Sequence, residues 1–332
     1  MLQVQQVLLS LAVFLATAHA FNASHVFPVP VKAGSAWTTL PTAPAGNGAS
    51  AQVVPLTDKA LGVIKVSANL THNVVLAPDI GTAPTGTQAW QALYPAGSYN
   101  PSATDAPRGG IGMYFPGPTG AALNWSDPSV TQIVFSYAVF FPAGFQFVKG
   151  GKLPGPYGGA TNDTAFACSG GRQEDRAGCF DLRLMWRTDG AGEVYAYLPE
   201  LDSNSAAVTK LKGSILDSSF GASVARGAFK FATGDWTVVA QRVQLNNVTA
   251  ANPDGEIELF VNGVSVIHAT GLTIRSQAES VFRGVHFQTF FGGSDNTWAS
   301  PVDQTTYFAA ISGAVLNPGA SPNEGKAAFP LA

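Results

Sequence analysis

Charged side chains are scarce in this chain of 332 residues: they make up 12% of it, and the formal net charge is −3 at pH 7. A protein that binds nucleic acid or an anionic membrane surface needs an excess of basic residues, which this composition does not supply. We therefore expect neither nucleic acid nor a membrane among its partners. An anionic ligand fits the composition only where cations are concentrated, as they are between residues 149 and 187.

Cysteine and histidine are also rare, with two and five residues. The two cysteines, Cys168 and Cys179, have no nearby histidines and make a poor zinc site, so we expect no metal and no cofactor. In an oxidising compartment they would instead form a disulfide. Across so short a loop, a disulfide contributes about 2 to 3 kcal/mol of stability. We expect it to fix the loop that leads into the strand starting at Cys179.

Long hydrophobic runs are absent except at the N-terminus. Residues 7–16 are mostly apolar and precede Ala18-His19-Ala20, a small-x-small cleavage pattern. We interpret residues 1–20 as a signal peptide and expect a secreted, extracellular protein. No later run approaches the roughly 20 apolar residues of a membrane span. Five Asn-x-Ser/Thr sequons predict surface glycans on some of the following residues: Asn22, Asn69, Asn124, Asn162 and Asn247.

The signatures of several enzyme classes are missing as well. The chain has no Gly-x-Ser-x-Gly elbow to present a nucleophilic serine. Its glycine-rich GGKLPG segment, which we expect to form a turn that presents Lys152, lacks the spacing of a phosphate-binding loop and is not followed by helical periodicity. These absences argue against serine nucleophile chemistry and against a P-loop nucleotide site.

Glycine, proline and phenylalanine are abundant, with 36, 22 and 21 residues, and short alternating runs are frequent. This pattern favours strands and turns, and Asn262-Gly263 marks the clearest hairpin. We expect one all-β domain at residues 21–332, a monomeric jelly-roll sandwich of two antiparallel sheets. We interpret residues 29–51 as a surface-wrapping lead-in and residues 81–108 as a long irregular loop. Strands are predicted at residues 62–70, 132–140, 179–187, 193–198, 236–245, 256–261, 264–269, 283–290 and 307–315.

Two consecutive predicted strands carry charged and phenolic side chains on one face. Period-two alternation places these seven residues together: Asp181, Arg183, Met185, Arg187, Glu193, Tyr195 and Tyr197. Pairing Arg187 with Glu193 across the turn would set the register. Met185 would then face Tyr195, and Arg183 would face Tyr197. Cations and phenols would share one sheet surface.

Five segments in one order resemble polysaccharide lyase family 14, particularly its fungal members. They are VKGGKLPG, RLMWR followed by GEVYAY, GDWTVVAQRVQLN, DGEIELFVNG and HFQTFFGGSDNTWASP, all within residues 132–315. The resemblance implies a jelly roll whose concave sheet forms a groove for an acidic polysaccharide. It also implies cleavage by β-elimination, which leaves a 4,5-unsaturated uronic acid end. Alginate and glucuronan are the substrates implied, and the glucuronan lyases of family 20 are the nearest alternative assignment.

The resemblance further implies a set of catalytic residues. The family's lysine in GGKLPG corresponds to Lys152, its arginine in RLMWR to Arg183, and its alternating tyrosines to Tyr195 and Tyr197. The family commonly has a serine two residues before that arginine, where this chain has Asp181. A carboxylate there would repel a uronate unless it pairs with Arg183 or is protonated.

These residue types suit the chemistry of β-elimination. Removing the C5 proton of a 4-linked uronate places negative charge on its carboxyl group, which Lys152 and Arg183 would stabilise. A base must take that proton and an acid must protonate O4. Tyrosines can do either where neighbouring cations lower their pKa. The sequence leaves open which tyrosine takes which role and whether a deprotonated Lys152 is the base.

Further substrate-binding candidates are Asp181, Arg187, Tyr157, His286 and Gln288. His286 and Gln288 alternate on one predicted strand and have groups that can hydrogen-bond a uronate carboxyl group. Tyr157 follows the KLPG segment and is a candidate to stack on a sugar ring. Each of these three side chains fits an ordinary packing role equally well.

Two other functions stay open at this point. A lectin-like protein that binds acidic polysaccharides without cleaving them would use the same Lys152 and Arg183, because jelly rolls also serve as lectins. A glycoside hydrolase would need paired carboxylates such as Asp181 and Glu193. That second alternative leaves Lys152 and both tyrosines without a role.

Overall fold

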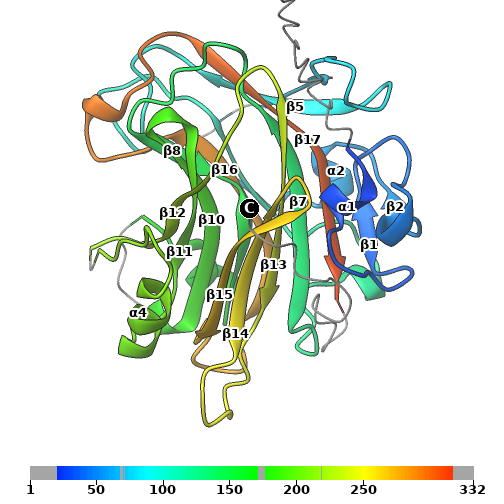
Figure 1. Cartoon of the computed structure of the whole chain (residues 1–332), viewed down its shortest axis with the longest axis vertical. Coiled ribbons are helices and arrows are strands. Elements are labelled where there is room, and N and C mark those ends of the chain that lie inside the picture. The colour runs from blue at the N-terminus through cyan, green and yellow to red at the C-terminus, as the bar shows by residue number, and fades with distance from the viewer. Residues whose placement is uncertain (1–20, 68–69, 71, 171–175, 218, 317–332) are drawn as a thin grey trace, which may run out of the picture.

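The computed structural model describes residues 21–67, 70, 72–170, 176–217 and 219–316. The signal peptide expected at residues 1–20 and the sequon at Asn69 lie outside these residues. Two sheets of nine and eight strands are stacked face to face (Figure 1). Among these described residues, all strand pairings but two are antiparallel: β1 pairs with β2 in parallel, and an isolated bridge between Phe141 and Thr233 is also parallel. The structure confirms the predicted all-β sandwich.

The nine-stranded sheet has the order β15-β14-β13-β7-β17-β1-β2, with β5 also paired to β17 and β4 paired to β5. Its strands are β1 (Ala36–Thr38), β2 (Gln52–Val53), β4 (Asn73–Leu76), β5 (Gln88–Tyr94), β7 (Gln132–Phe140), β13 (Trp236–Gln244), β14 (Gly255–Val261), β15 (Val264–Leu272) and β17 (Gln304–Val315).

The eight-stranded sheet has the order β12-β11-β10-β8-β16-β6-β3, and β9 bridges β10 and β16 beyond the end of β8. Its strands are β3 (Lys65–Val66), β6 (Ile111–Phe115), β8 (Gly150–Leu153), β9 (Gly155–Gly159), β10 (Cys179–Arg187), β11 (Ala191–Tyr197), β12 (Ala222–Lys230) and β16 (Val281–Phe291). This sheet carries the candidate site.

Helices are short. They are α1 (Ala23–Val26), α2 (Asp58–Leu61), α3 (Asn162–Phe166) and α4 (Asp202–Thr209), with single 3-10 turns at Gly46–Gly48, Ala121–Leu123, Arg176–Gly178, Thr188–Gly190 and Asn296–Trp298. In the part of the chain that the structure describes, no helix is long and apolar enough to cross a membrane.

The main core lies between the two sheets and is strongly aromatic. Trp90 and Tyr137 from the nine-stranded sheet pack with Trp186 and Phe287 from the eight-stranded sheet, and all four are buried. Because Trp186 and the leucines of β10 point into this core, the alternate residues of β10 point away from it. Alternation therefore places the charged and phenolic side chains on the outer face of the eight-stranded sheet.

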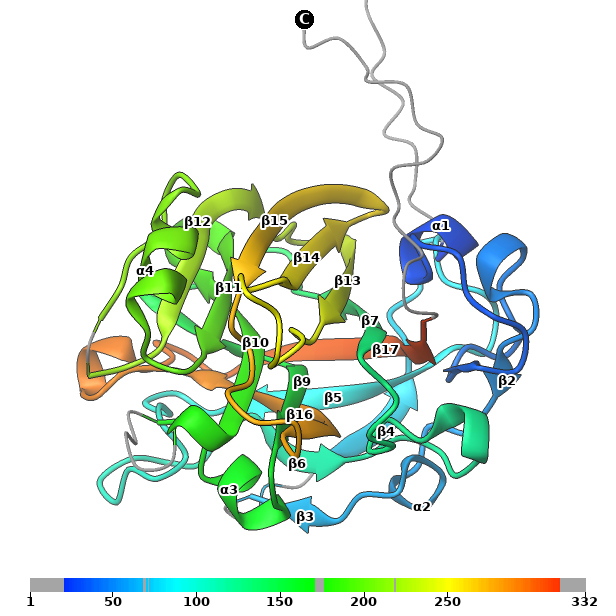
Figure 2. The same cartoon turned by 90° about the horizontal axis from the view of Figure 1, so that it is seen from below.

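A second apolar cluster covers the outer face of the nine-stranded sheet. Val26, Phe27 and Val29 of the N-terminal segment pack against Trp236 of β13 and Ala309 of β17. Strand β1 pairs with β17, and both views place α1 and β2 on the β17 side of the molecule, away from β10 and β11 (Figure 1 and Figure 2). The lead-in interpretation of residues 29–51 is therefore incomplete, since this segment contributes β1 and covers a sheet.

The predicted strands 132–140 and 179–187 match β7 and β10 at both ends. The predicted strand at 62–70 is reduced to Lys65–Val66. The interpretation of residues 81–108 as an irregular loop is wrong, because β5 lies inside it and pairs with β17. The alternating side chains of β5 were missed because the strand is short and is flanked on both sides by residues typical of loops, such as glycine, proline and threonine.

Candidate active site

The register between β10 and β11 brings the expected residues together, but in a different pairing from the predicted one. Arg183 lies opposite Tyr195, Asp181 opposite Tyr197, and Met185 opposite Glu193. The predicted register is wrong by two residues. The turn between the strands is a 3-10 turn at Thr188–Gly190, so β11 already begins at Ala191.

Lys152 lies on strand β8 rather than in the loop predicted from its glycines. It pairs with Met185 of β10 on one side and Phe290 of β16 on the other. The neighbouring Gly151 is required by close packing, because a Cβ there would overlap the Trp186 ring and the Phe290 carbonyl oxygen. A central strand fixes the Lys152 backbone more firmly than a surface turn would.

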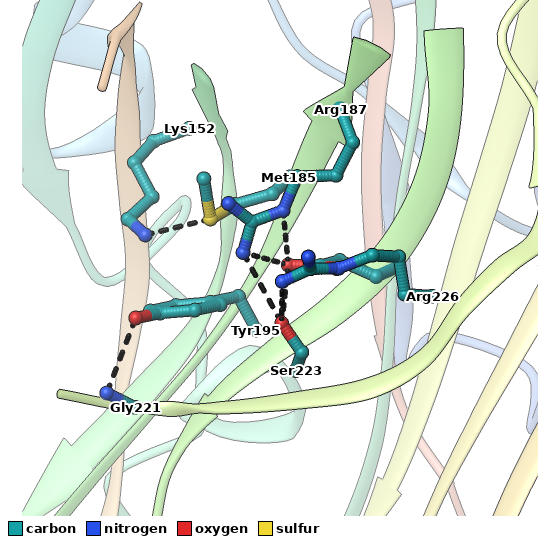
Figure 3. Close-up of polar contacts among 8 residues, drawn as sticks. Lys152, Met185, Arg187, Tyr195, Gly221, Ser223 and Arg226 are labelled. Carbon is teal, nitrogen blue, oxygen red and sulfur yellow. Dashed lines mark hydrogen bonds and ion pairs between the residues drawn. The ribbon is translucent and has the colours of Figure 1, made fainter. Parts of the chain in front are cut away.

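The Lys152 amine is almost completely buried. Its Nζ lies 2.7 Å from Met185 Sδ and 3.3 Å from the centroid of the Tyr195 ring (Figure 3). Burial and then the charges of Arg183 and Arg187 hold the pKa of Lys152 well below its usual value. The amine is therefore poised to lose its proton far more easily than a surface lysine.

Arg183 is fully buried and is held by two side chains. Its Nε lies 3.2 Å from Asp181 Oδ2, and its Nη1 donates a hydrogen bond of 2.6 Å to Gln288 Oε1. Burial opposes ionisation of Asp181, but the charge of Arg183 and the hydrogen bond from His286 help to outweigh it, so the pKa of this carboxyl group is lowered. The carboxylate at the position of the family serine is thus paired within the protein, as its place beside Arg183 requires.

His286 donates from Nδ1 to Asp181 Oδ2 at 2.8 Å, since that carboxylate is ionised. Its ring stacks on Tyr114 with centroids 4.0 Å apart and is only 1% exposed. Burial lowers the pKa of His286 to about 4, so the ring is neutral near pH 7. The prediction that His286 contacts substrate does not fit this burial; it contacts Asp181 instead.

Tyr195 and Tyr197 pack edge to face, with ring centroids 5.4 Å apart. The phenol oxygen of Tyr195 accepts the Gly221 N–H at 3.2 Å, and that of Tyr197 accepts the Gly170 N–H at 3.2 Å. Burial raises the pKa of Tyr195, which contradicts the expectation that cations would lower it. With its oxygen already accepting a hydrogen bond, this phenol can direct its own proton outward as a donor.

Glu193 is completely buried beside Tyr195 and is surrounded by cations. Its Oε1 accepts hydrogen bonds from Arg187 at 2.6 and 2.9 Å and from Ser223 at 3.0 Å, while its Oε2 accepts one from Arg226 at 2.8 Å (Figure 3). The sequence did not point to Ser223 or Arg226, because no strand was predicted at β12.

Three further predictions concern Tyr157, the two cysteines and the sequons. Tyr157 is fully buried between Tyr114 and Phe166, so it is not available to stack on a sugar, contrary to the prediction. The predicted disulfide between Cys168 and Cys179 is present. Four of the sequons lie on the exposed surface, at Asn22, Asn124, Asn162 and Asn247.

One hollow of about 300 Å³ lies away from Lys152, between α4 and the ends of β11 and β12. Its lining includes three acidic side chains, Glu200, Asp202 and Asp217, against one basic side chain, Arg176. An acidic polymer would be repelled there, so the candidate site is the polar sheet face and not this hollow. Among the described residues, no group of three or more His, Cys, Asp or Glu is placed to hold a metal ion.

Comparisons with known proteins agree with this geometry. The chain is similar to the crystal structure of the PL-14 alginate lyase from Aplysia kurodai, with 29% identity and a TM-score of 0.66 over 85% of this chain and 100% of that chain. It is also similar to an alginate lyase from Chlorella virus, with 23% identity and a TM-score of 0.58 over 77% of this chain and 93% of that chain. No curated protein matches it. The family profile described as Polysaccharide lyase 14 matches residues 82–311, more than half of the sequence, and the chain therefore belongs to polysaccharide lyase family 14.

Proposed function

We propose that this polysaccharide lyase is exported and cleaves a 4-linked uronate polymer by β-elimination. The observation that carries the proposal is the Lys152 amine, whose pKa is lowered by burial and by the nearby charge of Arg183, and which lies over the ring of Tyr195. A neutral amine beside a fixed cation and a phenol is the set of groups that the reaction needs. Alginate is the first candidate substrate, since a 29% identical structure is an alginate lyase, and glucuronan is the second.

Gln288, held by the buried Arg183, would bind the carboxyl group of the sugar that is cleaved. Gln288 accepts from Arg183 through Oε1, so its amide N–H groups remain to donate to a ligand. Gln288 is partly exposed, whereas Arg183 is buried, so Gln288 would make the direct contact and Arg183 would act through its charge and its hydrogen bond to Gln288. As the C5 proton leaves, charge accumulates on the carboxyl oxygens, and donors fixed in advance stabilise it without reorganising.

The proton transfers follow from the two opposite pKa shifts. Lys152 in its neutral form takes the C5 proton, and the electrons of that C–H bond form the C4=C5 double bond while the C4–O4 bond breaks. Tyr195, which stays protonated because burial raises its pKa, donates its proton to O4. The new Lys152 ammonium lies against the Tyr195 ring and returns a proton to the phenolate, which restores both groups.

Export is supported by two features of the described chain. The disulfide between Cys168 and Cys179 suits an oxidising compartment, and four sequons are exposed where a glycan would not disturb packing. We propose an extracellular enzyme acting on a polymer outside the cell. Mass spectrometry of the exported protein would show both cleavage after residue 20 and the glycans.

The direct test of the reaction is ultraviolet absorbance of the 4,5-unsaturated product on polymannuronate, polyguluronate and glucuronan. Lys152→Arg places a permanent cation where the amine was, so kcat should fall by about 10² to 10⁴-fold. Tyr195→Phe should lower kcat while polymer binding is kept. The control is Lys210→Arg, the same change at an exposed lysine outside the site.

Absence of product from the unmodified protein on all three polymers, with measurable polymer binding, would overturn the proposal in favour of a lectin-like protein. Full activity of Lys152→Arg would instead remove Lys152 from the role of base while leaving the reaction intact.

A further inference from the structure

A cluster of two arginines around one buried carboxylate lies beside the candidate active site. Arg187 and Arg226 both pair with Glu193, at 2.6 and 2.8 Å, and both donate to Ser223 Oγ, at 3.1 and 2.6 Å. Glu193 is 0% exposed. Two guanidinium groups and one carboxylate leave a net charge of +1 in the cluster.

That excess charge faces solvent in part. The side chains of Arg187 and Arg226 are 13% and 34% exposed. Each arginine uses Nε and Nη2 for Glu193 and Ser223, and in the described part of the chain neither Nη1 group has a hydrogen-bond partner. One cation is enough to neutralise the charge of a buried carboxylate, so the second arginine brings a positive charge beyond neutralisation, although each arginine binds a different oxygen of Glu193.

The cluster has a defined position relative to Arg183. Ser223 of β12 pairs with Tyr195 of β11, and Tyr195 pairs with Arg183 of β10. Two strand spacings are roughly 10 Å, which is too far for one carboxyl group to reach both sites. In Figure 3 the Arg187 guanidinium lies between Lys152 and Arg226, so the cations continue from the catalytic lysine toward the β12 edge.

We propose that Arg187 and Arg226, held in place by Glu193, form a second carboxylate-binding subsite for a neighbouring uronate of the polymer. The inference rests on the proposed function and adds substrate recognition to it. Fixed guanidinium groups recognise a carboxylate through paired N–H donors, which a neutral sugar cannot satisfy. The protein would thereby favour uninterrupted uronate runs over polymers in which uronates are interspersed with neutral sugars.

The test compares alginate with partially carboxyl-reduced alginate, in which some carboxyl groups have become neutral alcohols. Arg226→Gln removes the exposed cation but keeps an amide that can donate to Glu193 Oε2, while Arg187 and Ser223 still donate to Oε1. A hydrogen bond to a charged group contributes about 1.5 to 3 kcal/mol, so kcat/KM and binding affinity on alginate should each fall roughly 10- to 100-fold. On the reduced polymer both quantities should change little.

Arg226→Lys should recover part of the preference for alginate over the reduced polymer. Lys230→Gln removes another exposed cation from β12 and should change neither kcat/KM nor binding affinity on either polymer. If Arg226→Gln lowers kcat/KM and binding affinity equally on both polymers and also lowers the unfolding temperature, the subsite is overturned. Arg226 then only stabilises the buried Glu193. Failure of the proposed function would appear separately, as no product from the unmodified protein. The binding measurement needs no turnover and still decides the subsite in that case.

Discussion

The Lys152 amine is surrounded by groups that act on its pKa in opposite directions. Burial, Arg183 and Arg187 lower the pKa, whereas the carboxylates of Glu193 and Asp181 raise it. The residue at the position of the family serine, Asp181, therefore does more than contact Arg183, because it also acts on the pKa of Lys152. In this chain Asp181 adds a negative charge that partly restores the basicity of the lysine.

We predict that Asp181→Asn moves the acid limb of the pH profile of kcat to lower pH. Below the pKa of Lys152 the amine is protonated and cannot accept the C5 proton, so kcat falls on the acid side. Removing the Asp181 charge removes a group that stabilises the ammonium form, so the pKa of Lys152 and the acid limb both shift downward. The measurement is kcat on the preferred polymer across a pH series.

The control is Asp163→Asn, which removes an exposed carboxylate from α3 without touching the site. Because Asp181 pairs with the buried Arg183, Asp181→Asn should also lower the unfolding temperature, and kcat is therefore measured well below it. An acid limb that stays in place would show that Asp181 does not act on the catalytic base.

At the scale of elements, strands with one face on the core could be predicted closely. β7 and β10 match at both ends, because alternation between core and polar residues runs through their whole length. The same alternation correctly placed Arg183 with the tyrosines on one face. The register failed because Arg187 reaches Glu193 diagonally, through its long side chain, and not from the directly opposite position.

Burial was the part of the site that the sequence could not predict. Lys152 was expected on a turn because glycines flank it, yet those glycines allow strands to approach closely. Tyr157 was expected in a loop after the KLPG segment and His286 on a strand with alternating side chains, but α3 and Tyr114 cover that end of the sheet. The elements that bury these side chains come from distant parts of the sequence. Neither their shifted pKa values nor their loss of exposure to substrate could therefore be inferred from the neighbouring residues.

The disulfide between Cys168 and Cys179 links the segment that precedes β10 to the candidate site. Cys168 and Cys179 pack in one cluster with Met185, Tyr195 and Tyr197. The bond also anchors the chain next to Gly170, whose N–H is donated to the Tyr197 phenol. Its role is therefore to hold a phenol of the candidate site as well as to stabilise the fold.

We predict that replacing both cysteines by serine lowers the free energy of unfolding by about 2 to 3 kcal/mol, as expected for a short closed loop. Because Tyr197 loses a fixed neighbour and packs against Tyr195, the proposed proton donor, kcat should fall too, with a smaller change in KM. Denaturant unfolding and steady-state kinetics at low temperature measure the two effects separately. A variant that loses stability but keeps kcat would restrict the bond to a structural role.

At the scale of the whole molecule, the N-terminal segment extends both sheets. The family match covers residues 82–311, yet β1 and β2 lengthen the nine-stranded sheet and β3 lengthens the eight-stranded sheet. Residues 21–51 also cover the outer apolar cluster of the nine-stranded sheet. We infer that residues preceding the family match are needed for folding, and that residues 21–316 unfold as one unit.

Trp37 tests this inference, because it lies on β1, is 0% exposed and pairs with Gly313 of β17 within the main core. Trp37→Ala should lower the free energy of unfolding by about 3 to 5 kcal/mol, since the surrounding side chains cannot refill so large a cavity. Val53→Ala on the neighbouring β2 removes a side chain that is 46% exposed and should change stability by about 0.5 kcal/mol or less. Fluorescence and far-ultraviolet circular dichroism should report one shared transition in both variants. If Trp37→Ala leaves the main transition where it was and only a minor, earlier transition moves, the N-terminal segment is a separate unit, and the nine-stranded sheet is stable without it.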